Sequence, residues 1–453
     1  MSHLASHLPV LRCRKSETPS ITPSSCGPAG GSLSRTALPP QSQQAESADS
    51  CRDQEGIPVP VRSTIHKVVV IGGGYAGTLA ANRLRKRDDV GITLVNPRPR
   101  FIERMRLHQF VAGTGGATAD YGSLLGEGID LVVDSATRID TAARTVRLAS
   151  GRDLDYDYVI YAVGSTAAIP PSVPGAAEVA VSIAEWESAQ RVRARLDELP
   201  PDAPVTVVGA GLTGIETAAE LAEQGRRITL VCGGILAPSL SASTRRSVFR
   251  WLSRHGVAVL ESAAVTNVRQ HDVVLADADV RPSALTICAA GFGVPEPAAT
   301  SGLRTDELGR LRTDETLTSI DDARIVATGD AAAPSGQPVR MSSRAAAPLG
   351  AQAADTVLSR IAGTEPAMID FAFTGSGVSL GRHDGVRQFA RKDDTALNMY
   401  LGGRAAAAHK ELTCKLELFK IRLEARRPGS MPWPKGGTRP EQPVSSARAV
   451  ASS

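Results

Sequence analysis

Residues 68–84 read VVVIGGGYAGTLAANRL, an apolar run followed by Gly72, Gly74 and Gly77 and then by an alanine-rich stretch. This order is typical of a strand that turns tightly into a helix and holds a dinucleotide pyrophosphate at the turn. The first glycine permits the turn, the second lets the backbone approach the pyrophosphate, and the third lets the helix pack closely on the strand. The N-terminus of the helix adds free N–H groups that favour an anion.

The same pattern returns at residues 205–221, VTVVGAGLTGIETAAEL, with Gly209, Gly211 and Gly214. A single copy is a weak signal, because glycine-rich turns also arise by chance. Here both copies follow a buried type of strand and open a helical pattern, which is the context that supports the motif. The sequence therefore predicts two nucleotide-binding units. The alternative is an ordinary α/β protein with glycine-rich turns, in which both motifs would have arisen by chance.

Length and composition indicate a folded protein of two to three domains. The chain has 453 residues, of which 42% are hydrophobic and 22% charged. No stretch approaches the roughly 18 consecutive apolar residues of a membrane-spanning helix. The six cysteines include no CxxC, no CxxxxC and no metal-ligand spacing, so we expect reduced thiols in a cytoplasmic protein without a metal site. We expect small-molecule partners and no nucleic acid.

The motif order predicts an α/β fold with two doubly wound, Rossmann-like nucleotide-binding domains and a C-terminal α+β region. The first domain covers residues 63–175 and 297–365, because a further buried strand lies in RIVATGDAA at 324–332. The second domain, residues 176–296, is then inserted in the first. Residues 366–427 form the C-terminal region.

Both ends of the chain differ in composition from the body. Residues 1–62 are rich in Pro, Ser, Gln and Gly and predict a disordered extension. A targeting role, a flexible tail and a start codon placed too far upstream are all open for it. Residues 428–453 predict a flexible tail. The net charge of +4 lies mainly in residues 404–453, which hold ten Lys and Arg against four Asp and Glu.

In this order of motifs the chain resembles the two-dinucleotide-fold flavoproteins of the pyridine nucleotide-disulfide oxidoreductase superfamily, and within them the type II NADH dehydrogenases. Besides the two fingerprints, the resemblance rests on YDYVIYAVGS at 156–165, GFG at 291–293 and ATGD at 327–330. It covers residues 63–365 well and 366–427 loosely. It implies an enzyme that takes hydride from NADH or NADPH onto FAD and passes electrons to a quinone or another small acceptor.

The resemblance places FAD in the first fingerprint and NAD(P)H in the second. It implies that Asp330 hydrogen-bonds the flavin ribityl chain, where the alternative is a plain turn aspartate. The expected FAD-binding residues are Gly72, Gly74, Tyr75, Ala76, Gly77, Asn96, Arg104, Gly164, Gly329 and Asp330. The expected NAD(P)H-binding residues are Gly209, Gly211, Gly214, Cys232 and Gly291.

The acid expected about 20 residues after each fingerprint is missing. Asn96 stands after the first, and its amide can still hydrogen-bond a ribose. Cys232 stands after the second, so no carboxylate repels a 2′-phosphate there. NADPH therefore stays open beside NADH, the family's usual donor. Four arginines close in sequence are compatible with it: Arg226, Arg227, Arg245 and Arg246.

Two residues are candidates for catalysis. Glu216, in the first turn of the second fingerprint's helix, lies near the nicotinamide–flavin contact by resemblance; alternatively it only favours the helix dipole, or forms a solvated face with Glu220 and Glu223. Gln352 matches one of the glutamines that the type II dehydrogenases carry near the quinone, but Pro348 stands at the other.

Further residues are expected beside the flavin. The segment 101–113 offers Arg104, Arg106 and His108, with a basic helix face and a packing histidine as the alternative. Arg340 and Met341 are expected on the flavin's far side.

The predicted helix 409–426 carries two apolar stripes, one for the body and one for a membrane surface or a second subunit. A helix buried on both sides is the alternative. The stripes are Leu412, Leu416, Phe419 and Leu423, and Cys414, Leu418, Ile421 and Ala425.

Two other functions stay open. A reductase of a protein electron carrier, of the ferredoxin or rubredoxin type, would use the same two nucleotides. So would a redox-sensing flavoprotein without turnover, because a fold alone does not determine a function.

Overall fold

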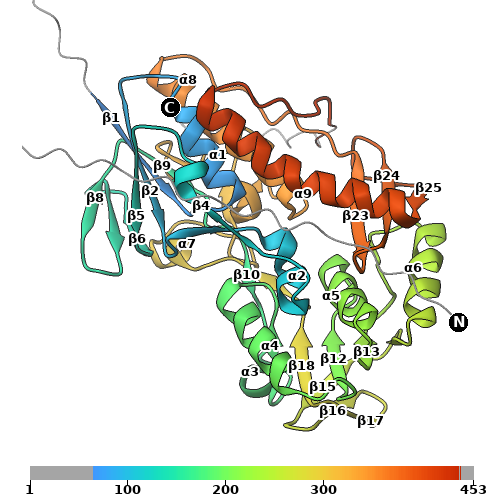
Figure 1. Ribbon diagram of the computed structural model, residues 1–453. Helices are drawn as coiled ribbons and strands as arrows, with labels where there is room; N and C mark the ends of the chain where they lie inside the picture. Colours follow the sequence, from blue (N-terminus) through green and yellow to red (C-terminus); the bar gives the residue numbers. More distant parts are fainter. Residues whose placement is uncertain (1–64, 438, 440–453) are drawn as a thin grey trace, which may run out of the picture. The chain divides into compact units, whose positions relative to one another are not determined.

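The computed structural model describes residues 65–437 and residue 439, so the predicted extension at 1–62 lies outside the described residues. Within that part the fold is α/β, as predicted, and each glycine fingerprint belongs to its own five-stranded parallel sheet (Figure 1).

The first parallel sheet has the strand order β21-β9-β1-β2-β5. Its last strand in the sequence, β21, pairs with β9 although more than 160 residues separate them. The chain thus returns to this sheet after the second one is complete. The strands are β1 (His66–Ile71), β2 (Val90–Asn96), β5 (Ile129–Val133), β9 (Tyr158–Tyr161) and β21 (Ile325–Ala327).

The second parallel sheet has the order β11-β18-β12-β13-β14 and lies between the first sheet's β9 and β21 in the sequence. This order agrees with the predicted insertion, while the residue bounds of the two domains stay a prediction. The strands are β11 (Val181–Ser182), β12 (Val205–Val208), β13 (Ile228–Val231), β14 (Ala258–Leu260) and β18 (Leu285–Cys288). The helices of this region are α3 (Ala176–Val179), α4 (Trp186–Glu198), α5 (Leu212–Glu223) and α6 (Ala242–Arg254).

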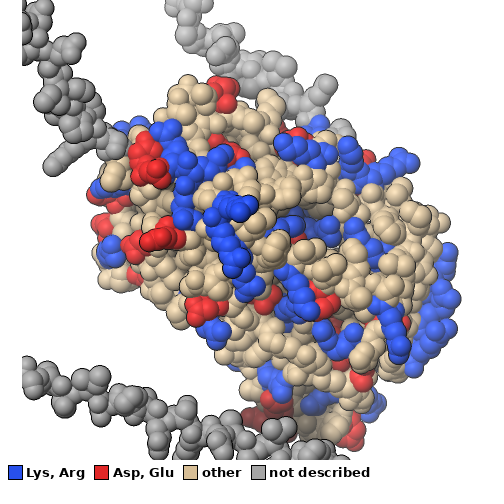
Figure 2. Space-filling model, turned by 45° about the horizontal axis from the view of Figure 1, so that its top comes forward, with Lys and Arg blue, Asp and Glu red and all other residues tan. Residues whose placement is uncertain are grey.

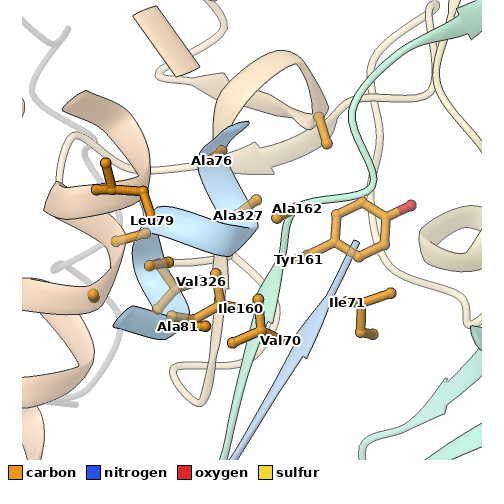
Figure 3. Packing of buried hydrophobic residues seen from close by; sticks show 14 of the residues in the cluster. Val70, Ile71, Ala76, Leu79, Ala81, Ile160, Tyr161, Ala162, Val326 and Ala327 are labelled. Atoms are coloured by element: carbon orange, nitrogen blue, oxygen red, sulfur yellow. The ribbon is translucent and has the colours of Figure 1, made fainter. Parts of the chain in front are cut away.

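Small residues let two helices cross closely over the first sheet. These are α1 (Tyr75–Leu84) and α8 (Ser343–Ile361). A Cβ added at Gly350 would lie 2.3 Å from the Ala76 carbonyl oxygen, so a larger residue there would push the helices apart. Beneath them, β-branched and aliphatic side chains of the sheet fill the core, as Figure 3 shows for Ile160 and Val326. Such continuous apolar strands are typical of a parallel sheet covered on both faces.

Short elements surround the two parallel sheets. The pairs β3–β4, β10–β19 and β20–β22 and the triplets β6-β7-β8 and β15-β16-β17 are small sheets of their own. The bounds of these strands are β3 (Arg100–Ile102), β4 (Thr118–Asp120), β6 (Ala136–Asp140), β7 (Thr145–Leu148), β8 (Asp153–Asp155), β10 (Thr166–Ala167), β15 (Val265–Val268), β16 (Asp272–Leu275), β17 (Val280–Pro282), β19 (Phe292–Gly293), β20 (Leu311–Thr313) and β22 (Ala332–Pro334). The remaining helical turns are η1 (Arg104–Arg106), α2 (Leu107–Ala112), η2 (Tyr121–Ser123), α7 (Pro297–Thr300) and η3 (Gly329–Ala331).

The C-terminal region is an antiparallel sheet followed by a long helix, in agreement with the predicted α+β character. The sheet consists of β23 (Gly375–Leu380), β24 (Asp384–Ala390) and β25 (Ala396–Gly402). The helix α9 (Gly403–Arg426) packs against β24 and α1, and it passes over both in Figure 1. It begins six residues before the predicted start at 409, because the alanines at 405–408 are strong helix formers.

The predicted mobile end differs from the structure at residues 428–437, which pack on the body. Met431 is buried, and the Trp433 indole donates to the Asp370 carbonyl oxygen at 2.8 Å. The Glu424 carboxylate accepts the backbone N–H groups of Gly429 and Met431. Residues 440–453 lie outside the described residues. No helix in the described part of the chain is long and apolar enough to cross a membrane.

Candidate functional site

A cleft opens along the carboxyl edge of the first parallel sheet. It consists of two adjoining cavities of about 290 and 310 Å³, which share Gly74, Arg104, Gly164 and Ser165 in their walls. The second cavity reaches Asn96 at the end of β2, and the first reaches α5, α8 and α9. Parallel sheets generally bind ligands at this edge.

The three glycines of the first fingerprint differ in what surrounds them. A Cβ at Gly72 would lie 2.3 Å from the Ala162 carbonyl oxygen, and one at Gly77 would lie 1.8 Å from the Gly72 carbonyl oxygen. Gly72 also has a φ of +102°, which side chains rarely adopt. A Cβ at Gly74 would meet nothing within 4 Å. The outer two glycines are therefore required by packing, and the middle one leaves backbone open to the cleft at the N-terminus of α1.

The second fingerprint repeats this geometry. A Cβ at Gly209 would lie 2.8 Å from the Ala290 nitrogen, and one at Gly214 would lie 1.8 Å from the Gly209 carbonyl oxygen. At Gly211, the N-cap of α5, an added Cβ would meet nothing within 4 Å. Next to each parallel sheet there is thus a helix N-terminus whose backbone is not covered by other protein atoms. A pair of dinucleotide sites requires this arrangement.

Asn96 holds the fingerprint turn from the neighbouring strand. Its Oδ1 accepts the Gly73 N–H at 3.0 Å and its Nδ2 donates to the Arg98 carbonyl oxygen at 2.7 Å. The Tyr121 hydroxyl donates to the Gly73 carbonyl oxygen at 2.6 Å. Tyr121 and Arg98 line the same cavity, and the sequence reasoning missed both, because neither belongs to a motif.

Arg104 and Asp330, predicted from distant segments, meet through Ser165. Arg104 Nη1 donates to the Ser165 carbonyl oxygen at 2.8 Å, and the Ser165 hydroxyl donates to Asp330 Oδ2 at 2.7 Å. Burial lowers the pKa of the Arg104 guanidinium, and the negative charge of Asp330 partly offsets this effect. Among the described residues no carboxylate oxygen lies within 4 Å of Arg104, so its charge faces the cleft. Gly329, with a φ of +65°, turns the chain beside Ala76 so that Asp330 reaches the cavity.

The expected NAD(P)H residues Cys232 and Gly291 do not line either cavity of the cleft. Cys232 directly follows β13 at the carboxyl edge of its sheet, and burial raises the pKa of its thiol to about 11, so it is uncharged at neutral pH. A Cβ at Gly291 would lie 2.4 Å from the Ala168 carbonyl oxygen, which explains a glycine there by the close crossing of two connecting segments. Their roles toward a nucleotide stay predictions.

The four arginines near the second fingerprint do not gather at one place. Arg226 Nη2 donates to the Leu196 carbonyl oxygen at 2.6 Å, and residues 226 and 227 precede β13, at the opposite end of the strand from Cys232. Arg245 and Arg246 lie on α6 and line a cavity of about 530 Å³ together with Glu261. Of the four arginines that were compatible with NADPH, only Arg245 and Arg246 therefore remain relevant.

Glu216 lies in the wall of the cleft and is ionically paired. Its Oε1 lies 2.7 Å from Lys410 Nζ on α9 and accepts the Ser379 N–H at 2.9 Å, while its Oε2 lies 3.8 Å from His108 Nδ1. The positive neighbours, Lys410 first, lower the pKa of this carboxyl against the opposing effect of burial. Glu216 and Glu220 are both buried, so the solvated face that we considered for them is wrong. Lys410 enters this site through the tertiary structure alone.

His108 is a buried, uncharged partner in this cluster. It lines the cleft, and its Nε2 has no hydrogen-bond partner among the described residues. Burial lowers its pKa to about 4, because an imidazolium would lose its hydration.

This lowered pKa predicts a loss of stability on acidification. The folded pKa lies below the ordinary value of 6.5, so below pH 6.5 the unfolded chain binds the proton that the folded one refuses. From pH 7 to pH 5 we expect His108 to cost about 2 kcal/mol of folding free energy. Urea midpoints should therefore fall less on acidification in His108→Asn than in the wild type. The exposed His271→Asn is the control, and an identical fall in all three proteins would contradict the assignment.

Gln352 is not brought to the cleft. Its Nε2 donates to the Ala367 carbonyl oxygen at 2.8 Å, and the residue is absent from the walls of both cavities. The reason lies in the rotation of α8: Arg344 and Ala346, near the start of the helix, face the cleft, while Gln352 faces the segment before β23. We therefore do not assign it a catalytic role. Arg340 and Met341 do line the cleft, as expected.

Arg106, in contrast, points away from the cleft and forms a bidentate pair with Glu411 of α9, at 2.9 and 3.0 Å. The cysteines of the described part, Cys232, Cys288 and Cys414, are unpaired, and no group of three or more His, Cys, Asp or Glu in that part is arranged to hold a metal.

Comparisons with known proteins agree with this geometry. A profile of the pyridine nucleotide-disulphide oxidoreductase family matches residues 66–350. An NADH dehydrogenase-like protein of Mycobacterium tuberculosis is 29% identical over 296 residues, which cover 59% of this chain and 73% of that protein. The type II NADH:quinone oxidoreductase of Staphylococcus haemolyticus is 25% identical over 398 residues, covering 78% and 96%.

The structure of the sulfide:quinone oxidoreductase from Aquifex aeolicus superposes with a TM-score of 0.68 at 21% identity, covering 79% of this chain and 92% of that one, which shows a common fold. The family profile spans more than half of the chain and includes both glycine fingerprints. The chain therefore belongs to the pyridine nucleotide-disulphide oxidoreductase family and is an oxidoreductase that uses FAD and a nicotinamide cofactor.

Proposed function

We propose that the protein is an FAD-dependent NAD(P)H dehydrogenase that passes electrons to a quinone. One observation carries this proposal: the cleft that begins at the first fingerprint ends against side chains of the second nucleotide-binding unit and of the C-terminal region. Thr213 and Glu216 come from α5, and Lys410 and Thr413 come from α9. A hydride donor, a flavin and an acceptor can share this end of the cleft.

The residues present fit FAD. Gly74 leaves backbone N–H groups open at the N-terminus of α1, where a pyrophosphate is favoured. Arg104 brings a partly buried positive charge without a carboxylate within 4 Å among the described residues, and Asp330 brings a carboxylate for a hydroxylated chain. When bound, FAD supplies a ring that accepts a hydride and releases electrons one or two at a time.

The cluster of Glu216, Lys410 and His108 holds the titratable protons at this wall. Reduction of a quinone by NADH takes up two electrons and two hydrogens, one arriving as hydride and one as a proton from solvent. Lys410 Nζ carries protons at the cleft surface, and the Glu216 carboxylate keeps it charged by raising the pKa of that ammonium against burial. His108 stays neutral, because its pKa is lowered to about 4, and it is an uncharged neighbour of the pair that does not take up its proton.

Similar proteins support a quinone as acceptor, since the Staphylococcus protein is an NADH:quinone oxidoreductase and the Aquifex protein, which shares the fold, is a sulfide:quinone oxidoreductase. The rival function, a reductase of an acidic protein carrier, rests on the positive charge of residues 404–453.

The proposal is tested by mixing the FAD-loaded protein with NADH or NADPH without oxygen. The yellow band should bleach within seconds with at least one donor and return when a soluble quinone is added. Return with ferredoxin or rubredoxin but not with quinones, in a salt-sensitive manner, would select the rival. A band that bleaches but returns with none of these acceptors would favour the redox-sensing interpretation, and a band that never bleaches would contradict the proposal.

The exposed stripe of α9 provides a surface for the membrane in which quinones dissolve. Leu412, Leu416 and Phe419 are exposed, while Cys414 and Ile421 on the opposite side are buried. The first stripe is thus free and the second packs on the body, one of the arrangements that the sequence left open. Figure 2, with the upper part of Figure 1 turned forward, shows many Lys and Arg side chains among uncharged surface. Such a face suits an anionic lipid surface.

We expect the double variant Leu416→Glu/Phe419→Glu to lose most of its binding to vesicles containing phosphatidylglycerol. Repulsion of the new carboxylates and loss of apolar insertion act together, and a fall of about 100-fold is expected. Val133→Glu/Val280→Glu, which alters exposed valines elsewhere, is the control. A wild type that sediments as a dimer, and a variant that is monomeric with unchanged vesicle binding, would assign the stripe to a subunit contact instead.

A further inference from the structure

Two arginines of the C-terminal wall share one hydrogen-bond acceptor. Arg344, near the start of α8, lines the cleft, and its Nη2 donates to Thr374 Oγ1 at 3.0 Å. Arg387, on β24, is buried behind it, and its Nη2 donates to the carbonyl oxygen and Oγ1 of Thr374 at 2.9 and 3.1 Å. The two guanidinium groups therefore converge on one threonine at the cleft.

Their charges are not balanced by a carboxylate in contact. Among the described residues no carboxylate oxygen lies within 4 Å of either guanidinium. The other cations of this wall are paired, Arg340 with Asp394 and Lys410 with Glu216.

Burial lowers the pKa of the Arg344 guanidinium. The opposing charge that acts on it, Glu417, lies beyond 4 Å and already binds Lys420 at 3.0 Å through Oε1. Burial and the charge of Arg344 lower the pKa of Arg387 to about 10, so both groups remain charged at neutral pH. Burial, and after it the charges of both arginines, lowers the pKa of His409, whose buried Nδ1 has no partner among the described residues.

A buried and a partly buried charge of the same sign, Arg387 and Arg344, are unfavourable together unless an anion accompanies them. The place for that anion is the cleft, because Arg344 borders it. The backbone around Gly375 and Gly377 also lines the cleft here. A neutral acceptor would leave the two charges unbalanced, whereas an acceptor with one negative group would form charge-assisted hydrogen bonds with Arg344.

We propose that the electron acceptor is an anion, a quinone that carries a carboxylate, a sulfonate or an ionised hydroxyl group on its ring, held by Arg344 with Arg387 behind it. This inference rests on the proposed function and names the chemical class of its acceptor. Arg344 is a binding residue, and Arg387 is a positioning residue that acts through Thr374.

The experiment compares two naphthoquinones, 1,4-naphthoquinone-2-sulfonate and neutral menadione, with the full-length FAD-loaded protein. The quantity measured is the ratio of their kcat/KM values, so that their different reduction potentials cancel between proteins. In Arg344→Gln this ratio should fall about ten-fold, the usual effect of losing a charge-assisted hydrogen bond. Arg344→Lys should keep part of the wild-type preference for the sulfonate, because the lysine side chain keeps the positive charge.

Arg360→Gln is the matched control. Arg360 lies on the same helix, and its Nη2 likewise donates to a threonine hydroxyl, Thr318 Oγ1, at 2.8 Å, but it does not line the cleft. The same change of residue and charge there should leave the ratio within two-fold. An equal loss for both quinones in Arg344→Gln would show that Arg344 acts on the flavin instead and would overturn the inference.

Binding without turnover separates the inference from the proposed function. The redox-inactive 2-naphthalenesulfonate should perturb the flavin absorbance of the oxidised wild type at about ten-fold lower concentration than 2-naphthalenemethanol. The difference should vanish in Arg344→Gln. Anion-selective binding without quinone turnover would refute the quinone as acceptor but keep the anion site. Turnover of both quinones without anion selectivity would refute the anion site alone.

Discussion

Gly74→Val should abolish FAD binding, and Gly211→Val should abolish reduction by NAD(P)H while leaving FAD bound. In both positions the backbone is extended, with φ of −77° and −70°, so a valine can be accommodated without strain. A Cβ added at either glycine has no protein atom within 4 Å. It occupies the side from which a pyrophosphate approaches the helix N-terminus, and we expect affinity to fall by at least about 100-fold.

The two variants control each other, because each damages one nucleotide site and spares the other. Gly116→Val, at another open glycine outside both fingerprints, should change neither cofactor. The measurements are the flavin absorbance after reconstitution and the bleaching of that band by NADH or NADPH. A Gly74→Val protein that keeps its yellow colour would contradict the assignment of the first fingerprint to FAD.

Lys410→Met should destabilise the protein by about 3 to 5 kcal/mol, because it leaves the Glu216 carboxylate buried without its cation. The pair lies at 2.7 Å with both side chains nearly inaccessible to solvent. Lys86→Met, which breaks a partly exposed pair with Asp355 at 3.1 Å, should cost less than about 1 kcal/mol. The double variant Lys410→Met/Glu216→Gln should recover much of the loss, since no unpaired charge remains.

The stability that Lys410→Met loses should depend on pH. Without Lys410, the burial of Glu216 raises its pKa above the ordinary value, so the folded state prefers the neutral carboxyl group. Stability should then be retained at acidic pH and lost as the pH rises through that raised pKa. Because His108 lowers the stability of both proteins at acidic pH, the quantity to measure is the difference in urea midpoint between Lys410→Met and the wild type, which should be smaller at pH 5 than at pH 7. A midpoint equal to the wild type at pH 7 would show that the pair is not buried in solution.

The role in turnover that we propose for the same pair is tested by Glu216→Gln. The glutamine side chain would keep a hydrogen-bond acceptor for the Ser379 N–H while removing the charge that Lys410 faces. FAD should stay bound, and the flavin should be reduced more slowly by the nicotinamide cofactor. An unchanged reduction rate would remove Glu216 from the site.

The sequence by itself determined the family, the two nucleotide-binding units and their order. These follow from local rules: a glycine next to a carbonyl oxygen, such as Gly77 beside Gly72, is required by backbone sterics that act within a few residues. The periodicities of the strand and the helix around each fingerprint are equally local, and the structure has a strand and a helix at both places.

Only the tertiary structure decided which side chains meet in the cleft. Lys410 and Glu216 are 194 residues apart (410 − 216) and pair because α9 crosses β23 and β24 beside α5. Gln352 lies away from the cleft for a related reason, because α8 packs on α1 at Gly350 and its rotation depends on this contact with a distant segment. Charge pairs and helix rotations depend on contacts between distant segments, and a pattern along one chain does not contain them.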